Sequence, residues 1–116
     1  MNEYEHFFIL VNPVPLNGHS SSIHVSLQDG KGETVEEIQE NALLSDNNFR
    51  DLSGLYIGLN TAEKHGIKKV TVLTNNVFLR AMVQSERKEM DSYGFSPDIK
   101  KLIGNFEEVG IDVVRW

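Results

Sequence analysis

A pair of side-chain amides, Asn75 and Asn76, directly follows the short apolar segment 70–74. A long stretch with helical periodicity and a glycine come before this segment, so the local order is helix, turn, strand and two amides. In many α/β folds, the end of such a strand carries groups that bind a ligand or catalyse a reaction. Here the two residues at that position are neutral amides, and the scarcity of carboxylates at the expected site is the main basis for the functional interpretation.

Other residue types capable of chemistry lack a recognisable arrangement. His19 and His24 have no partner at the spacing of a helical zinc site. The polar segment 17–22 lacks the pattern and the lysine of a phosphate-binding loop, and its serines lack the Gly-x-Ser-x-Gly turn of a nucleophile elbow. The chain contains no cysteine, which excludes disulfides and thiolate metal sites.

Length and composition indicate one domain, residues 1–116, with an ordinary globular balance of apolar and charged residues. The formal net charge of −6 argues against tight, nonspecific nucleic-acid binding, which requires many cationic contacts to phosphate. No apolar run approaches the roughly 18 residues of a membrane span. The N-terminus carries acids where a signal peptide has basic residues, so we expect a cytoplasmic protein without a membrane partner.

The first third of the chain indicates three strands. Residues 6–11 form a continuous apolar run, expected to be buried on both faces and to end in a turn at Asn12–Pro13. Residues 22–27 alternate between apolar and polar types, as in a half-buried strand. A turn at 29–32 leads to a weaker strand at 33–41, whose acids indicate a solvated face. These short connections predict an antiparallel meander.

The rest of the chain shows helical stripes with capping residues and glycine stops, alternating with short β-branched segments. The expected elements are a helix from 45–48 to Gly66, a strand at 69–74, helices at 77–89 and from Ser96 to Gly110, and a strand at 111–114. The order βββαβααβ predicts an α/β fold with a five-stranded mixed sheet, in which the later strands return through helices and run parallel to the first.

The first expected helix opens with residues 46–59, Asp-Asn-Asn-Phe-Arg-Asp-Leu-Ser-Gly-Leu-Tyr-Ile-Gly-Leu. This run resembles the Thr-Asn-Asn-x-Ala-Glu-Tyr-x-Ala-Leu-x-x-Gly-Leu pattern of type 1, or reverse-transcriptase-like, ribonuclease H domains. The Gly-Ile turn, strand and Asp-Ser of that family correspond to Gly66–Ile67, 70–74 and Asn75–Asn76. The resemblance covers essentially the whole chain and implies a ribonuclease H-like fold in which the family's C-terminal helix is missing.

Members of that family hold two magnesium ions with four carboxylates, and the resemblance implies where these positions fall. The first falls on Asn12, the second on Asp51 and the third on Asn75, while the fourth has no counterpart before Trp116. Asp51 is then the only remaining carboxylate of a degenerate catalytic site and the only candidate metal ligand. Each residue also has a structural interpretation: Asn12 starts a turn, Asp51 favours the helix dipole, and the pair Asn75–Asn76 caps the helix that follows.

Three functional hypotheses follow. The first is a catalytically inactive ribonuclease H-like domain, without a cofactor, retained for nucleic-acid or protein binding. The second is a weak or altered metal-dependent ribonuclease that acts on RNA/DNA hybrids, with one Mg²⁺ or Mn²⁺ held by Asp51 and the carbonyls of Asn12 and Asn75. The third is a homo-oligomeric module, such as a homo-dimer, in which Trp116 and the last strand pair with a second copy.

Overall fold

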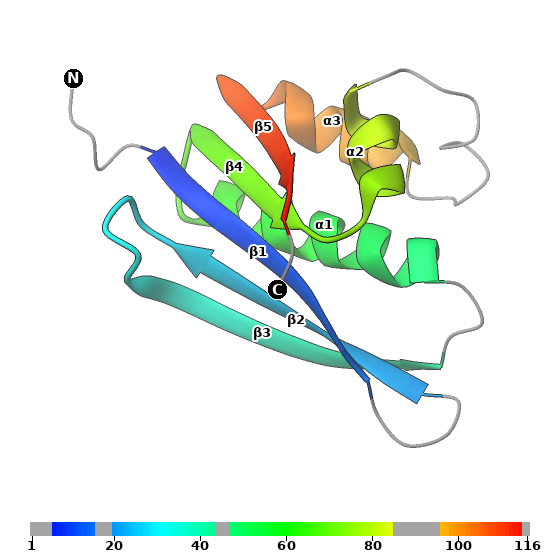
Figure 1. Cartoon of the computed structure of the whole chain (residues 1–116). Helices are drawn as coiled ribbons and strands as arrows, with labels where there is room; N and C mark the ends of the chain where they lie inside the picture. The colour runs from blue at the N-terminus through cyan, green and yellow to red at the C-terminus, as the bar shows by residue number, and fades with distance from the viewer. Residues whose placement is uncertain (1–5, 16–19, 44–46, 85–95, 115–116) are drawn as a thin grey trace.

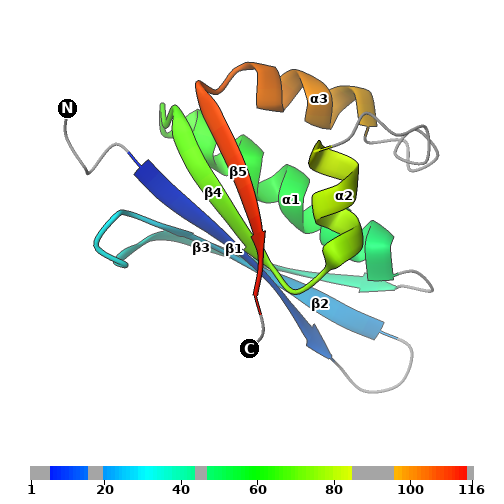
Figure 2. The same cartoon turned by 45° about the horizontal axis from the view of Figure 1, so that its top comes forward.

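Within the described part of the chain, five strands form one mixed sheet, and the helices lie together on one side of it (Figures 1 and 2). The computed structural model describes residues 6–15, 20–43, 47–84 and 96–114. The strands are β1 His6–Pro15, β2 Ser20–Gln28, β3 Thr34–Leu43, β4 Lys69–Thr74 and β5 Glu108–Val113; the helices are α1 Asn47–Lys64, α2 Val77–Gln84 and α3 Ser96–Gly104. This order, βββαβααβ, is the predicted one.

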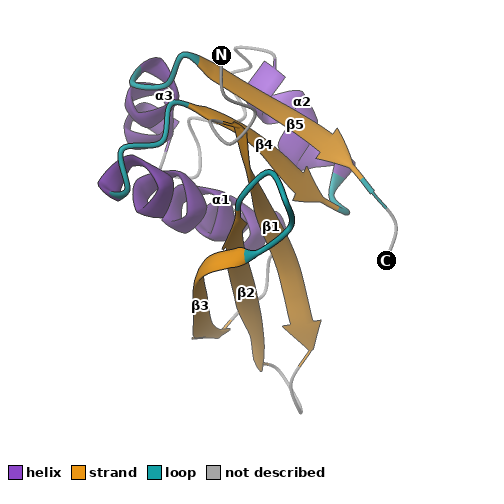
Figure 3. Cartoon of the chain, turned by 90° about the vertical axis from the view of Figure 1, so that its left-hand side faces the viewer, coloured by secondary structure: helices purple, strands orange, loops and turns teal. Residues whose placement is uncertain are grey.

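The sheet has the strand order β3-β2-β1-β4-β5. β1, β2 and β3 form an antiparallel meander, whereas β4 runs parallel to β1 and β5 runs parallel to β4, which confirms the predicted topology. Because the carboxyl ends of parallel strands meet at one edge of a sheet, the residues that follow β4 lie near the far half of β1. α1 crosses the face formed by β1 and β2, and α2 and α3 pack beside it (Figure 3).

The predicted turn at Asn12–Pro13 is wrong, because β1 continues to Pro15. Asn12 pairs with His24 and Pro13 pairs with Ile23 in the antiparallel ladder with β2. The paired residues of β1 and β4 end at Leu10 and Leu73, so the far half of β1 has a strand neighbour on one side only. A proline is compatible with a strand that has a free side, because its missing N–H then removes no ladder hydrogen bond.

The expectation that the first strand is buried on both faces is also wrong. Ile9 and Val11 face α1 and are fully buried, whereas Phe8 and Leu10 on the opposite face are only half-buried. In the described part of the chain, the helices cover one face of the sheet and leave the other without a helix. A continuous apolar run therefore predicts a strand but does not indicate whether one or both of its faces are covered.

The predicted end of the third helix is wrong. α3 ends at Gly104, and Gly110 lies inside β5, where it pairs with Thr71 of β4. β5 consequently begins at Glu108, three residues before the predicted start at Ile111. Two glycines follow the helical stripe, and sequence periodicity alone does not distinguish the one that stops the helix from the one that lies in the next strand. The segment 85–89 of the predicted second helix lies outside the described residues.

α1 ends at Lys64, just before the glycine that the sequence predicts as its stop. Gly66 adopts a positive φ of 75°, the left-handed conformation that glycine reaches without a Cβ clash. Its N–H donates to the Glu63 carbonyl at 2.9 Å, and the Ile67 N–H donates to the Ala62 carbonyl at 3.1 Å. This Schellman pattern satisfies the last carbonyls of the helix and turns the chain so that Ile67 enters the core.

The core lies between the sheet and α1. From α1, Leu52, Leu55, Leu59 and Ala62 are fully buried, as their helical spacing predicts. The same face contains Gly54, where a Cβ would lie only 2.7 Å from Val11 Cγ1, and Gly58, where a Cβ would overlap Ile9 Cγ2. The two glycines therefore let the helix backbone approach β1 and β2 closely. None of the described helices has the length and hydropathy needed to cross a membrane.

Candidate functional site

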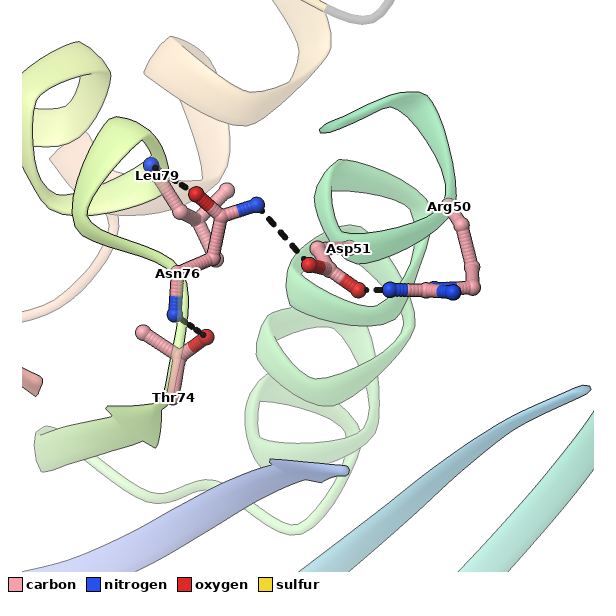
Figure 4. A network of polar contacts seen from close by, with 5 residues as sticks. All are labelled: Arg50, Asp51, Thr74, Asn76 and Leu79. Atoms are coloured by element: carbon pink, nitrogen blue, oxygen red, sulfur yellow. Dashed lines mark hydrogen bonds and ion pairs between the residues drawn. The ribbon is translucent and has the colours of Figure 1, made fainter. Parts of the chain in front are cut away.

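Asp51 is a buried carboxylate near the N-terminal end of α1, with a relative exposure of 2%. Its Oδ1 accepts a hydrogen bond from Arg50 Nε at 2.9 Å, and its Oδ2 accepts one from Asn76 Nδ2 at 2.8 Å (Figure 4). The Arg50 side chain is itself only 12% exposed, so this is a nearly buried ion pair. Both carboxylate oxygens are thus engaged by protein donors, and a guanidinium balances the negative charge.

Asn76 connects the end of β4 to the start of α2. Its backbone N–H donates to Thr74 Oγ1 at 3.1 Å, and its Oδ1 accepts from the N–H groups of Phe78 at 2.9 Å and Leu79 at 3.3 Å. Asn76 is therefore the N-cap of α2, which confirms the capping interpretation for this residue. Because the cap uses the side-chain oxygen, the side-chain nitrogen is left to donate to Asp51. One residue thereby ties β4, α2 and α1 together (Figure 4).

Asn12 and Asn75 have different surroundings from Asp51. Side chains alternate along a strand, so Asn12 points to the face opposite Val11 and away from α1. Asn75 is exposed, whereas Thr74 before it is fully buried. Continuing the parallel register past Leu10–Leu73 sets Asn12 level with Asn75 at the same sheet edge. Neither amide is hydrogen-bonded to Asp51, whose two oxygens contact Arg50 and Asn76.

The residues at this edge fit a two-magnesium site poorly. Mg²⁺ requires several oxygen ligands, and carboxylates or substrate phosphates must offset the cost of its dehydration. Asp51 supplies the one carboxylate among the three predicted positions, and its oxygens already accept from a cation and an amide. Within the described residues, no three His, Cys, Asp or Glu side chains are grouped so that they could hold a metal ion.

Sequence reasoning missed Arg50 as the partner of Asp51. Adjacent residues on a helix point in different directions, so no spacing rule associates them. It also placed the third site position on Asn75, whereas Asn76 is the amide that reaches Asp51. The available signal was the capping preference of Asn, because an N-cap side chain is directed back toward the helix start and not outward along the strand.

Comparison with solved structures shows a likeness at low sequence identity. The N-terminal RNase H domain of rv2228c from Mycobacterium tuberculosis, solved as a fusion with maltose-binding protein, aligns with a TM-score of 0.81 at 16% identity, over 94% of this chain and 81% of that one. RNase H1 from the halophilic archaeon Halobacterium salinarum gives 0.77 at 15% identity, over 94% and 85%.

A third solved structure, LC11-RNase H1 in complex with an RNA/DNA hybrid, gives a TM-score of 0.73 at 17% identity, over 93% of this chain and 84% of that one. No protein-family model and no curated protein sequence matches the chain. At identities this low the likeness establishes the fold and leaves the activity to be argued from the side chains.

Proposed function

Starting from the ribonuclease H-like fold of this chain, we propose that it is a binding domain without metal-dependent nuclease activity. The main observation in support of this proposal is that both carboxylate oxygens of Asp51 accept hydrogen bonds from other side chains. Its oxygens contact Arg50 and Asn76, and the two other predicted ligand positions are the neutral amides Asn12 and Asn75. Two-metal catalysis depends on anionic oxygens that gather the cations around the phosphodiester, and only Asp51 among the three predicted positions supplies them.

The acidic balance of the chain supports a protein partner over a nucleic acid. The net charge is −6, and exposed acids line β3, at Glu37 and Glu40. Such a surface repels the negatively charged phosphodiester backbone of a nucleic acid, whose affinity for proteins comes mainly from Lys and Arg contacts that release counterions. LC11-RNase H1 was solved with a hybrid bound. A weak nuclease that holds one metal through Asp51 would have to bring the cation to a carboxylate that is 2% exposed and already lies beside the cationic Arg50 side chain.

A cleavage assay tests this proposal. The purified chain is incubated with a labelled RNA/DNA hybrid and Mg²⁺ or Mn²⁺, beside an active ribonuclease H as positive control. We expect no cleavage above the background of buffer alone, and the same result for Asp51→Asn, which keeps the shape of the side chain and removes its charge. Metal-dependent cleavage by the wild-type chain that disappears in Asp51→Asn would overturn the proposal.

A further inference from the structure

A groove of about 450 Å³ lies between β3 and α1, and its lining includes no residue of the Asp51 network. β3 contributes Glu36, Ile38 and Glu40, which are alternate residues and therefore share the face toward α1. α1 contributes one helical stripe, whose members are Ser53, Tyr56, Ile57, Asn60, Thr61 and Lys64. The apolar side chains in the lining are Ile38 of β3 and Tyr56 and Ile57 of α1, and the other lining residues are polar.

The groove runs beneath a free sheet edge. β3 is the outermost strand on its side, so one row of its backbone N–H and C=O groups has no strand partner among the described residues (Figure 3). β3 is ten residues long, which is long for an edge strand. An added strand would direct every second side chain toward α1, into the groove. Such strand addition is a common way to bind an extended peptide, with the backbone supplying affinity and the groove supplying specificity.

The two ends of the groove differ in charge. At one end, Glu36 contacts His65 Nε2 at 2.9 Å and Lys64 Nζ at 3.5 Å, and the His65 hydrogen bond holds the pKa of Glu36 below its ordinary value. At the other end, Glu40 is exposed and makes no hydrogen bond or ion pair with any described residue. The groove therefore offers apolar side chains beside one carboxylate, Glu40, that has no ion-pair partner among the described residues.

A second copy of this chain is a poor occupant. Antiparallel pairing of β3 with itself about Ile38 would set Glu36 of each copy against Glu40 of the other, and like charges directly opposite destabilise a strand pair. A nucleic-acid backbone would meet the same acids. The complementary occupant is a peptide that places an apolar side chain against Ile38 and a cation against Glu40.

We propose that the outer edge of β3 and this groove bind an extended peptide segment of a protein partner. Within that segment, an apolar residue and a Lys or Arg occupy alternate positions, so that both side chains face α1. The apolar residue lies against Ile38, Tyr56 and Ile57, and the cation pairs with Glu40. The site rests on the proposed function in one respect, namely that the domain binds a protein.

A peptide array tests the site. The peptides have the length of β3, ten residues, with Thr at every second position and Leu, Lys or Glu at the others. We expect the full chain to bind peptides that carry Leu and Lys at neighbouring positions of the same face, and replacement of that Lys by Glu to weaken binding roughly fivefold, as for a solvent-accessible ion pair. Glu40→Lys should reverse this preference, so that the Glu peptides bind better.

Glu37→Lys is the matched control, because it makes the same charge change on the same strand. Glu37 pairs with Ser26 on the face away from α1 and lies 3.8 Å from His24, so this variant should keep the wild-type preference for Lys. N-methylation supplies a second readout. Methyl groups on the alternate peptide amides that pair with β3 should abolish binding, whereas methylation of the other set should leave it intact.

Three outcomes would overturn the site: no binding of any alternating peptide, equal effects of Glu37→Lys and Glu40→Lys, or equal effects of the two methylation patterns. The hybrid-cleavage assay on the same protein separates this result from the proposed function. Cleavage together with selective peptide binding would refute the inactive domain and leave the groove assignment standing. If the protein neither cleaves the hybrid nor binds any of the peptides, only the groove assignment is refuted.

Discussion

Replacing Asp51 with alanine is expected to lower the free energy of unfolding by about 3 kcal/mol, because it removes a charged partner of the nearly buried Arg50 guanidinium. The Arg50 and Asp51 side chains are 12% and 3% exposed, so solvent compensates little for the lost contact. The substitution also removes the acceptor for Asn76 Nδ2, which weakens the link between α1 and the start of α2.

Urea unfolding of the Asp51→Ala variant, followed by circular dichroism, measures this effect. Asp112→Ala is the matched control, since Asp112 is an exposed acid on β5, and we expect it to change stability by no more than about 0.5 kcal/mol. If Asp51→Ala were as stable as the wild-type chain, or more stable, the structural account would be contradicted. A carboxylate whose removal stabilises a fold is one that is held at an energetic cost for binding or catalysis.

Gly58→Ala is expected to lower the free energy of unfolding by about 2 kcal/mol, because the added methyl group overlaps Ile9 in the packed core. Helix propensity predicts the opposite sign, since alanine in place of glycine within a helix stabilises it by up to about 1 kcal/mol. The sign of the measured change therefore decides whether close packing of α1 against β1 or helix propensity dominates.

Gly104→Ala provides the comparison for Gly58→Ala in the same urea experiment. Gly104 is the last residue of α3, and its φ is not positive. Apart from its chain neighbours and its own helix backbone, no described residue has an atom within 4 Å of the place where its Cβ would be. We expect this variant to be at least as stable as the wild-type chain. An increase in stability for both variants would show that α1 does not pack against the sheet as closely as the structure indicates.

The order and pairing of the elements were predictable because each periodic pattern is local. The stripe through Leu52, Leu55 and Leu59 specifies a buried helix face, and the short loops specify antiparallel neighbours. Strand ends were less predictable, since they depend on which neighbour is present. β1 extends to Pro15 because β2 pairs with it beyond the last residue that pairs with β4.

The candidate site was predictable only in part. The amides at the end of β4 and the acid in α1 were identified, but the alternation of a strand and the geometry of a cap decide which side chains meet. Asn76 turns back to cap α2 and reaches Asp51, whereas Asn75, one residue earlier, is exposed. Residue types alone do not indicate which of two adjacent asparagines contacts Asp51.

The most direct test of the central claim is a Mn²⁺ titration of the ¹⁵N-labelled chain, read from the side-chain amide signals of Asn12, Asn75 and Asn76. The double variant Asn12→Asp/Asn75→Asp serves as the positive control, because two added carboxylates should raise the affinity for the cation about tenfold or more. We predict that the wild-type signals show no saturable broadening while the Asn12→Asp/Asn75→Asp protein broadens near Asn76. Saturable broadening of all three amides in the wild-type chain would show that this sheet edge gathers a divalent ion, and would contradict the account.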